Sequence, residues 1–268
     1  MPRRARVDAE LVRRGLARSR QQAAELIGAG LVSVDGMPAA KPATAVAVTA
    51  NITVTAGERT WVSRGAHKLI GALDTFAIDV GGRRCLDAGA STGGFTEVLL
   101  DRGAEEVVAV DVGYGQLAWS LRSDDRVVVI ERTNVRELTA EAISGTVDLV
   151  VADLSFIALA TVLPALTACA SPDADIVPMV KPQFEVGRER VGAGGVVSDP
   201  QLRAESVLSV AARAAALGWH TVGVTASPLP GPSGNVEYFL RLRARTDAAL
   251  HGDDLDQAVH RAVTEGPQ

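Results

Sequence analysis

Four charged residues, spread over most of the 268-residue chain, stand in short motifs whose residue types suit proton transfer. They are Lys68, Asp153, Lys181 and Glu237. Two amines and two carboxylates can share one pocket without a large net charge, and both types can accept, donate or orient a proton. Lysine suits such work because its charge responds to its surroundings, whereas arginine stays protonated. We therefore expect the four side chains to meet at one catalytic site.

A glycine-rich loop at residues 87–95 admits three interpretations. A dinucleotide-binding loop needs a second glycine where Ser91 stands. A hydrolase nucleophile elbow fits Gly89-Ala-Ser-Thr-Gly93, with His220 available as a base, but no glycine-rich oxyanion loop precedes it. The third interpretation is the first motif of a methyltransferase, whose tight turn and carboxylate hold the methionine end of S-adenosylmethionine. Asp111 favours it, because an acid about twenty residues beyond such a loop suits a ribose hydroxyl pair.

The elements that must position these residues are apolar strands alternating with helical patterns. Strands are expected at residues 84–87, 107–111, 127–130, 147–152 and 176–180, with helices between them. This alternation is typical of an α/β fold with a parallel sheet covered on both faces. The segments 220–226 and 235–243 follow each other without a long helix, which indicates an antiparallel pair at one edge.

Polar residues gather at one rim of this predicted sheet. Ligands of open α/β sheets bind beyond the carboxyl ends of the parallel strands. The residues expected there are Asp87, Asp111, Asn134, Asp153 and Lys181, and Glu237 reaches the same rim from the start of the reversed last strand.

The first 57 residues differ in charge from the rest of the chain. Their net charge is +4, whereas the remaining residues carry −9. A basic N-terminal segment in an otherwise acidic chain indicates that a polyanion binds at that end. Residues 8–15 and 19–28 are predicted helices, and Ser19 with Gln22 forms a capping box at the start of the second. A strand at 32–34 leads into the turn dipeptide Asp35-Gly36, so the segment is a small α+β module.

The chain therefore divides into a small domain at 1–57, a linker at 58–64 and a larger domain at 65–268. Trp61 is a large apolar residue within the polar linker. It packs either at a seam between the domains, where it would couple docking of the polyanion to the larger domain, or within the core of one of them.

Three stretches of the small domain carry a resemblance to a known family. Arg6-Val-Asp, Ala17-Arg-Ser-Arg-Gln-Gln-Ala and Ile27-Gly-Ala-Gly-Leu-Val-Ser-Val-Asp-Gly36 resemble the S4 RNA-binding domain. The resemblance implies RNA contacts by Arg4, Arg6, Arg18 and Arg20. Arginine suits this role because its planar fork binds phosphate oxygens bidentately. The glycine-rich segment after Lys181 adds Arg188 and Arg190, which we predict to contact phosphates as this loop closes over RNA.

The larger domain resembles the FtsJ-like RNA 2′-O-methyltransferases in its Lys–Asp–Lys–Glu order with the glycine loop after the first lysine. With an S4 domain in front, the whole chain resembles the TlyA (haemolysin A-like) family. That resemblance implies a Rossmann-like methyltransferase sheet that uses S-adenosylmethionine to methylate ribose 2′-hydroxyls. The expected substrate is cytidine in ribosomal RNA of the small and large subunits.

The resemblance also implies a role for each site residue. Lys181 would be the general base, which a weakly nucleophilic 2′-hydroxyl needs, and Lys68, Asp153 and Glu237 would orient it and the hydroxyl. The implied cofactor contacts are Asp87, Gly89, Ala90, Ser91, Gly93, Gly94, Phe95, Asp111, Asn134 and Asp153.

Two other classes of function stay open: a membrane-active haemolysin, and a non-catalytic RNA-binding assembly factor. The most hydrophobic stretch, 147–170, carries Asp148 and Asp153, which makes it a poor membrane span. No signal peptide is evident, so we expect a cytoplasmic monomer that acts on ribosomal RNA or ribosomal subunits. Cys85 and Cys169 lack metal-ligand spacing, so we expect buried thiols and no metal site.

Overall fold

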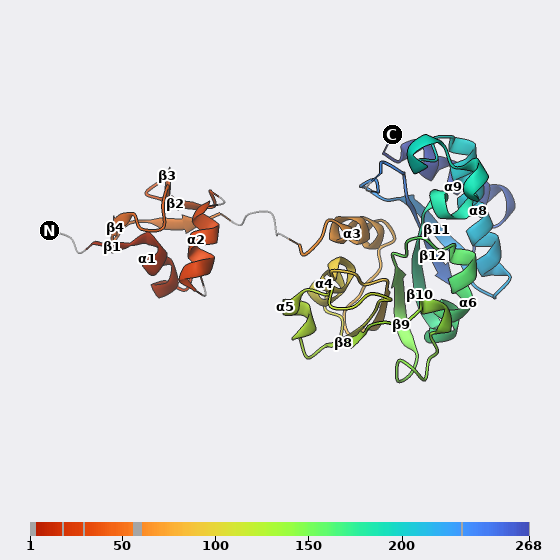
Figure 1. Ribbon diagram of the computed structural model, residues 1–268, viewed down its shortest axis with the longest axis horizontal. Helices are drawn as coiled ribbons and strands as arrows, with labels where there is room; N and C mark the ends of the chain where they lie inside the picture. The colour runs from red at the N-terminus through yellow and green to blue at the C-terminus, as the bar shows by residue number, and fades with distance from the viewer. Residues whose placement is uncertain (1–3, 18, 29, 56–60, 232, 268) are drawn as a thin grey trace. The chain divides into compact units, whose positions relative to one another are not determined.

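The computed structural model describes residues 4–17, 19–28, 30–55, 61–231 and 233–267. The chain forms two compact units, Met1–Thr60 and Trp61–Gln268 (Figure 1), with one hydrophobic core in the first and two in the second among these described residues.

The N-terminal unit packs two helices against short antiparallel strands. The helices are α1 (Val7–Arg13) and α2 (Arg20–Gly28). Strand β1 (Arg4–Arg6) pairs with β4 (Ala45–Ala47), and β2 (Val32–Val34) lies between β3 (Met37–Pro38) and β5 (Ile52–Val54). The Ser19 hydroxyl accepts a hydrogen bond from the Gln22 amide at 3.1 Å, as a helix cap does. The predicted α+β module and the start of its second helix are confirmed.

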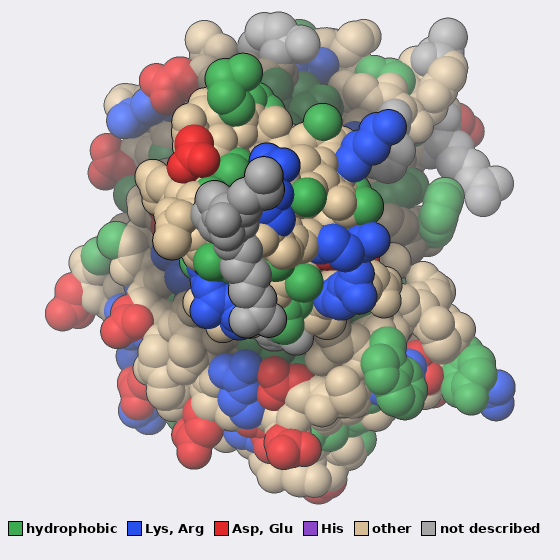
Figure 2. Space-filling view, turned by 90° about the vertical axis from the view of Figure 1, so that its left-hand side faces the viewer, with side chains coloured by type: hydrophobic (Ala, Val, Ile, Leu, Met, Phe, Trp, Pro, Cys, Tyr) green, Lys and Arg blue, Asp and Glu red, His purple; other side chains and the backbone are tan. Residues whose placement is uncertain are grey.

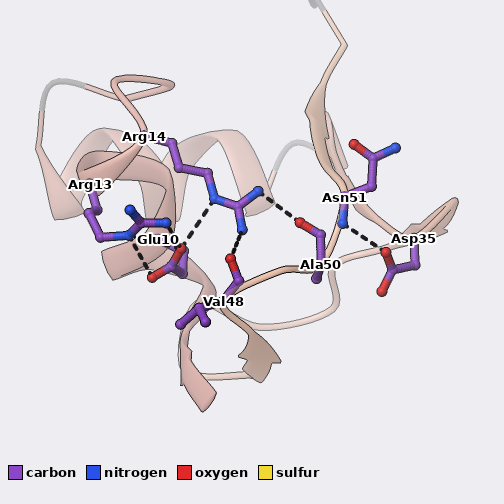
Figure 3. A network of polar contacts seen from close by, with 7 residues as sticks. All are labelled: Glu10, Arg13, Arg14, Asp35, Val48, Ala50 and Asn51. Atoms are coloured by element: carbon purple, nitrogen blue, oxygen red, sulfur yellow. Dashed lines mark hydrogen bonds and ion pairs between the residues drawn. The ribbon is translucent and has the colours of Figure 1, made fainter. Parts of the chain in front are cut away.

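Some arginines of this unit bind other residues of the same unit and so stabilise its fold (Figure 3). The Arg14 guanidinium donates hydrogen bonds to the carbonyl oxygens of Val48 and Ala50, each at 2.8 Å. Its Nε donates to the buried Glu10 carboxylate at 3.1 Å, and Arg13 donates to the same carboxylate. Arg14 therefore ties α1 to the segment that follows β4, which the charge count alone could not reveal.

The C-terminal unit contains a seven-stranded sheet in the order β11-β12-β10-β9-β6-β7-β8. The strands are β6 (Arg84–Ala88), β7 (Glu106–Val110), β8 (Val127–Ile130), β9 (Val147–Ala152), β10 (Ala170–Val180), β11 (His220–Ala226) and β12 (Tyr238–Arg243). Strands β6 to β10 are parallel, and β12 is antiparallel to both β10 and β11. The predicted mostly parallel sheet with antiparallel pairing at one edge is confirmed.

Strand β10 begins earlier than the predicted boundary at residue 176. Its first residues, 170–175, read Ala-Ser-Pro-Asp-Ala-Asp, and the pairing with β9 shifts register between Ala170 and Asp175. This polar, proline-containing stretch lacks an apolar pattern, so only its pairing with the neighbouring strand β9 shows that it belongs to the strand.

Helices cover both faces of the sheet (Figure 1). One layer contains α3 (Gly65–Thr75), α4 (Gly94–Asp101) and α5 (Trp119–Arg122), and the other contains α6 (Leu159–Cys169), α8 (Pro200–Ala215) and α9 (Gly252–Glu265). Each layer has its own core: Leu69, Leu99 and Phe239 belong to the first, and Leu163 and Val207 to the second. The carboxyl ends of the parallel strands are left as the rim on which polar loops meet.

Candidate active site

The four charged motif residues form two ion pairs that line one cavity. Lys68 Nζ lies 2.5 Å from Glu237 Oε2, and both side chains are buried, with exposed fractions of 6% and 1%. Lys181 Nζ lies 2.6 Å from Asp153 Oδ1 and donates a hydrogen bond to Ser155 Oγ at 3.0 Å. The structure thus brings together residues that are up to 169 positions apart.

Sheet topology explains this convergence. Asp153 follows β9 and Lys181 follows β10, and these two strands are parallel neighbours. Glu237 immediately precedes β12, whose Tyr238 pairs with Val180 in antiparallel register. Two carboxyl ends and one reversed beginning therefore share a rim, and the first turn of α3 supplies Lys68.

Both ion pairs are electrostatically stable only when the lysine and the carboxylate are both present. Each buried ammonium lies against one carboxylate, so the formal charges of the four side chains cancel. Removing one member of a buried pair leaves an uncompensated charge and costs about 3–5 kcal/mol of stability. Ion pairs of this kind fix the positions of the amines with little freedom.

The glycine loop wraps closely round the same cavity. Gly89 has φ of +91°, and a Cβ on it would lie 2.5 Å from the Asp153 carbonyl oxygen. A Cβ on Gly94 would collide with Ser63 Oγ. Ser91 takes φ of +49°, and its amide donates to Asp111 Oδ2 at 2.8 Å. Glycine is needed at 89 and 94 because backbone must approach backbone or a neighbouring side chain.

A second cavity of about 510 Å³ adjoins the first, which measures about 260 Å³. The two share Gly89, Ser91, Asp153 and Ser155, and the larger one also contains Asp111 and Asn134. Ala90, Gly94 and Phe95 line the smaller one.

The polar groups of the larger cavity fit a nucleoside-bearing cofactor. Each Asp111 carboxylate oxygen accepts one backbone hydrogen bond, from Gly113 at 2.6 Å or from Ser91 at 2.8 Å, and can still accept another. Asn134 Oδ1 caps the 3₁₀-helix Val135–Glu137 by accepting from the Arg136 amide at 3.1 Å. Asn134 lines the larger cavity, and its side-chain amide nitrogen can still donate a hydrogen bond. A carboxylate for ribose hydroxyls and an amide for a base edge suit S-adenosylmethionine.

Two predicted cofactor contacts lie behind the cavity wall. Asp87 is fully buried, accepts a hydrogen bond from Thr96 Oγ1 at 2.7 Å, and lines neither cavity. Burial raises the pKa of Asp87 to about 7. Gly93, with φ of +100°, packs toward Leu117 and Leu121. These two residues support the loop from behind, and a direct contact with a cofactor stays a prediction for both.

Five residues of the smaller cavity had no predicted role in the site: Ser63, Arg64, Gly65, Thr92 and Ser155. Ser155 had a usable signal, since it stands two residues after Asp153 in the same motif. Ser63 and Arg64 were assigned to the linker. The Val62 amide donates to Glu97 Oε2 at 2.7 Å, so this stretch belongs to the C-terminal unit.

Trp61 packs against the hydrophobic core of the C-terminal unit. This is one of the two placements expected for it. Residues 56–60 of the predicted linker lie outside the described residues, and the idea that Trp61 couples RNA docking to the C-terminal unit stays a prediction.

The hydrolase interpretation of the glycine loop is wrong. His220 pairs with Arg243 at the end of β12 remote from Glu237, whereas Ala226 pairs with Tyr238. At about 3.3 Å per strand residue, His220 is about 20 Å from the rim that holds Ser91. The two side chains cannot form a nucleophile–base pair.

The predicted RNA-contacting arginines lie in different settings. Arg4 is exposed on β1, and Arg6 and Arg20 are 50% and 58% exposed while both bind the buried Asp8 carboxylate. The Arg6 guanidinium holds the pKa of Asp8 well below its usual range. Figure 2 looks onto the N-terminal unit and shows Lys and Arg side chains gathered around the centre of this face.

Three further arginines were expected to contact RNA. Arg190 forms an ion pair with Glu205 of α8. Arg18 and the side chain of Arg188 lie outside the described residues, so their RNA contacts stay predictions.

Comparisons with known proteins show which families the two units of the chain match. Residues 61–244 match the FtsJ-like methyltransferase family, and residues 5–52 match the S4 domain. The chain is 78% identical over 100% of both lengths to 16S/23S rRNA (cytidine-2′-O)-methyltransferase TlyA of Mycobacterium tuberculosis. It is 37% identical to Hemolysin A of Brachyspira hyodysenteriae, covering 87% of this chain and 98% of that one.

A solved structure from Streptococcus thermophilus, provisionally named a hemolysin, superposes with a TM-score of 0.72. It is 36% identical and covers 99% of this chain and 97% of its own. None of the helices that the structure describes combines the length and the hydrophobicity that a membrane-spanning helix needs. The chain is a methyltransferase of the FtsJ-like family and, with its S4 domain in front, belongs to the TlyA family.

Proposed function

We propose that this enzyme methylates the ribose 2′-hydroxyl of cytidine in ribosomal RNA of the small and large subunits, with S-adenosylmethionine as methyl donor. The observation that carries the proposal is the meeting of two lysine–carboxylate pairs beside the glycine-loop cavity. The name of the Mycobacterium tuberculosis relative specifies the same reaction and both ribosomal RNAs.

Gly89, Ser91, Asp111 and Asn134 would hold the cofactor in the larger cavity. The bound sulfonium supplies an activated methyl carbon and its leaving group. Asp153 and Ser155 line both cavities, so they stand where the cofactor and the RNA ribose would meet. The protein then has two tasks, to orient the 2′-hydroxyl and to take its proton.

Lys181 is the proposed base for that proton. Its Nζ is held between Asp153 Oδ1, at 2.6 Å, and Ser155 Oγ, at 3.0 Å. Asp153 can hold a proton released from Nζ, after which the free amine accepts the proton of the hydroxyl. Lys68 and Glu237 form the opposite wall and would orient the ribose.

The N-terminal unit would supply phosphate contacts through Arg4, Arg6 and Arg20. Such contacts hold RNA through counterion release and set its position, and they carry no sequence information of their own. Selection of the methylated cytidine would then depend on the shape of the folded RNA.

The test is methyl transfer from tritiated cofactor to small and large ribosomal subunits that lack the modification, followed by mapping of the labelled nucleotide. We expect 2′-O-methylcytidine with the wild-type enzyme and with the control Arg213→Ala, whose exposed arginine is on α8. We expect none with Lys181→Ala, while RNA binding persists. Activity in Lys181→Ala would remove the assignment of the base. RNA binding without any transfer by the wild type would favour a non-catalytic assembly factor.

A further inference from the structure

The segment from the end of β7 to the first residue of α5 exposes aromatic side chains that the proposed reaction does not use. Tyr114 is 68% exposed and Trp119 is 78% exposed. The whole chain contains only three Trp, two Tyr and five Phe, so two of its ten aromatic residues stand in water on one short segment. Large exposed apolar side chains that cluster in this way mark a surface that binds a partner.

Hydrogen bonds donated by backbone amides hold this segment in place. The Gly113 amide donates to Asp111 Oδ1 at 2.6 Å, and the Gly115 amide donates to Glu131 Oε1 at 2.8 Å. The Arg132 amide donates to the Gly113 carbonyl oxygen at 3.1 Å. Tyr114 is therefore presented on a fixed turn between two anchored glycines.

A cation lies against the exposed ring. The Arg132 guanidinium carbon is 4.2 Å from the centroid of the Tyr114 ring, and Arg132 has φ of +54°. Among the described residues Arg132 forms no ion pair with a carboxylate, whereas the neighbouring Glu131 binds Arg122. An aromatic face beside a guanidinium that can still bind an anion offers two contacts to one nucleotide: stacking for the base and a charge for the phosphate.

This surface borders the cavity of the methyl donor. Val112 stands two residues before Tyr114 and Thr133 directly follows Arg132, and both line the larger cavity together with Gly89 and Asp153. A nucleotide on Tyr114 would thus lie beside the cavity that would hold the cofactor.

We propose that Tyr114, Arg132 and Trp119 form a binding platform for an unstacked nucleotide of the RNA substrate, beside the cavity that would hold the cofactor. The proposal rests on the proposed function and adds a second RNA contact on the catalytic unit. A protein partner is the competing occupant, but the guanidinium on the ring favours a group that offers a π-face and a phosphate together.

The experiment compares full-length Tyr114→Ala, Trp119→Ala and Arg132→Ala with the conservative Tyr114→Phe and Trp119→Phe. Arg213→Ala controls for loss of one exposed positive charge. Affinity is measured for deproteinised large-subunit ribosomal RNA, for a short single-stranded oligocytidine and for S-adenosylmethionine. Melting temperatures verify that each variant folds.

The alanine variants at 114 and 119 should bind RNA at least roughly 5-fold more weakly, the lower limit for loss of one base–aromatic stack. The phenylalanine variants should keep most of the affinity, and cofactor affinity should not change. Oligocytidine should quench tryptophan fluorescence of the wild type and should quench that of Trp119→Phe less.

Unchanged RNA affinity in both alanine variants, with a wild type that binds and methylates RNA, would overturn the platform. A loss confined to cofactor affinity would overturn it too and assign the loop to the cofactor. Normal binding of free RNA with reduced methylation of intact subunits would point to a ribosomal protein in place of a nucleotide. Absence of RNA methylation by the wild type would instead refute the proposed function.

Discussion

Removal of one negative charge from the basic face of the N-terminal unit should weaken RNA binding. The change is Asp8→Asn. The Asp8 carboxylate accepts hydrogen bonds from Arg6 Nε at 3.0 Å and Arg6 Nη2 at 2.8 Å, and from Arg20 Nη2 at 3.0 Å. Asp8 is itself buried, so its carboxylate has a fixed position and orients two half-exposed guanidinium groups.

Two effects of the change oppose each other. The charge of residues 1–57 would rise from +4 to +5, which on its own would strengthen attraction to RNA. Arg6 and Arg20 would lose their fixed orientation, and immobilising a long side chain on binding costs about 0.5–1.5 kcal/mol. For two arginines the sum is about 1–3 kcal/mol, which exceeds the gain from one charge on a screened surface. We expect a net loss of affinity of roughly 5-fold or more.

The assay is titration of labelled ribosomal RNA by fluorescence anisotropy at several salt concentrations. Glu25→Gln is the matched control, because it makes the same charge change on the exposed side of α2, where Glu25 accepts only a 3.3 Å hydrogen bond from Gln21 among the contacts described. Asp8→Asn should bind more weakly than the wild type, and Glu25→Gln equally or more tightly. If both variants bind more tightly by the same factor, net charge alone governs binding and the positioning role of Asp8 is refuted. Melting curves must show that Asp8→Asn stays folded, since Asp8 Oδ1 also accepts from the Ala9 amide at 2.7 Å.

Four further outcomes follow from the structure. Lys181→Arg keeps the charge opposite Asp153 but cannot give up a proton, so single-turnover methyl transfer should fall at least about 100-fold while RNA affinity stays within 2-fold; transfer at the wild-type rate would contradict a proton-accepting role. Gly89→Ala forces a Cβ to within 2.5 Å of the Asp153 carbonyl oxygen, and with a strain of about 1–3 kcal/mol it should weaken cofactor binding in calorimetry about 10-fold or more. Arg14→Ala removes bonds to Val48, Ala50 and Glu10 and should destabilise the N-terminal unit by about 1.5–3 kcal/mol, measured as hydrogen exchange of its amides. The pKa of Asp87 is raised from 3.8 to about 7 by burial, so the folded protein binds a proton that the unfolded chain has released, and stability should fall as pH rises between those values and then level. Asp87→Asn should flatten this part of the curve of melting temperature against pH, and an unchanged curve would show that Asp87 is ionised in the folded protein.

Much of the architecture was determined by the sequence itself, because it depends on local patterns. The strands at 107–111, 127–130 and 147–152 were predicted within one residue of the observed bounds, since continuous apolar runs of that length fit strands buried on both faces. The Ser19 cap is another local feature, decided by side-chain chemistry within one turn. The glycine loop and Asp111 could be recognised for the same reason.

Only the tertiary structure decided which charges pair. The sequence contained two lysines and two acids, but the pairing of Lys68 with Glu237 and of Lys181 with Asp153 depends on strand order and on the register that sets Tyr238 opposite Val180. The tertiary structure also distinguishes Arg14, whose guanidinium binds backbone carbonyl oxygens, from Arg6, which binds the Asp8 carboxylate and stays half exposed. Arginines in one short stretch look alike to any local pattern, because burial and partners come from residues distant in the chain. That non-local information also placed Asp87 behind the cavity and His220 at the far end of the sheet.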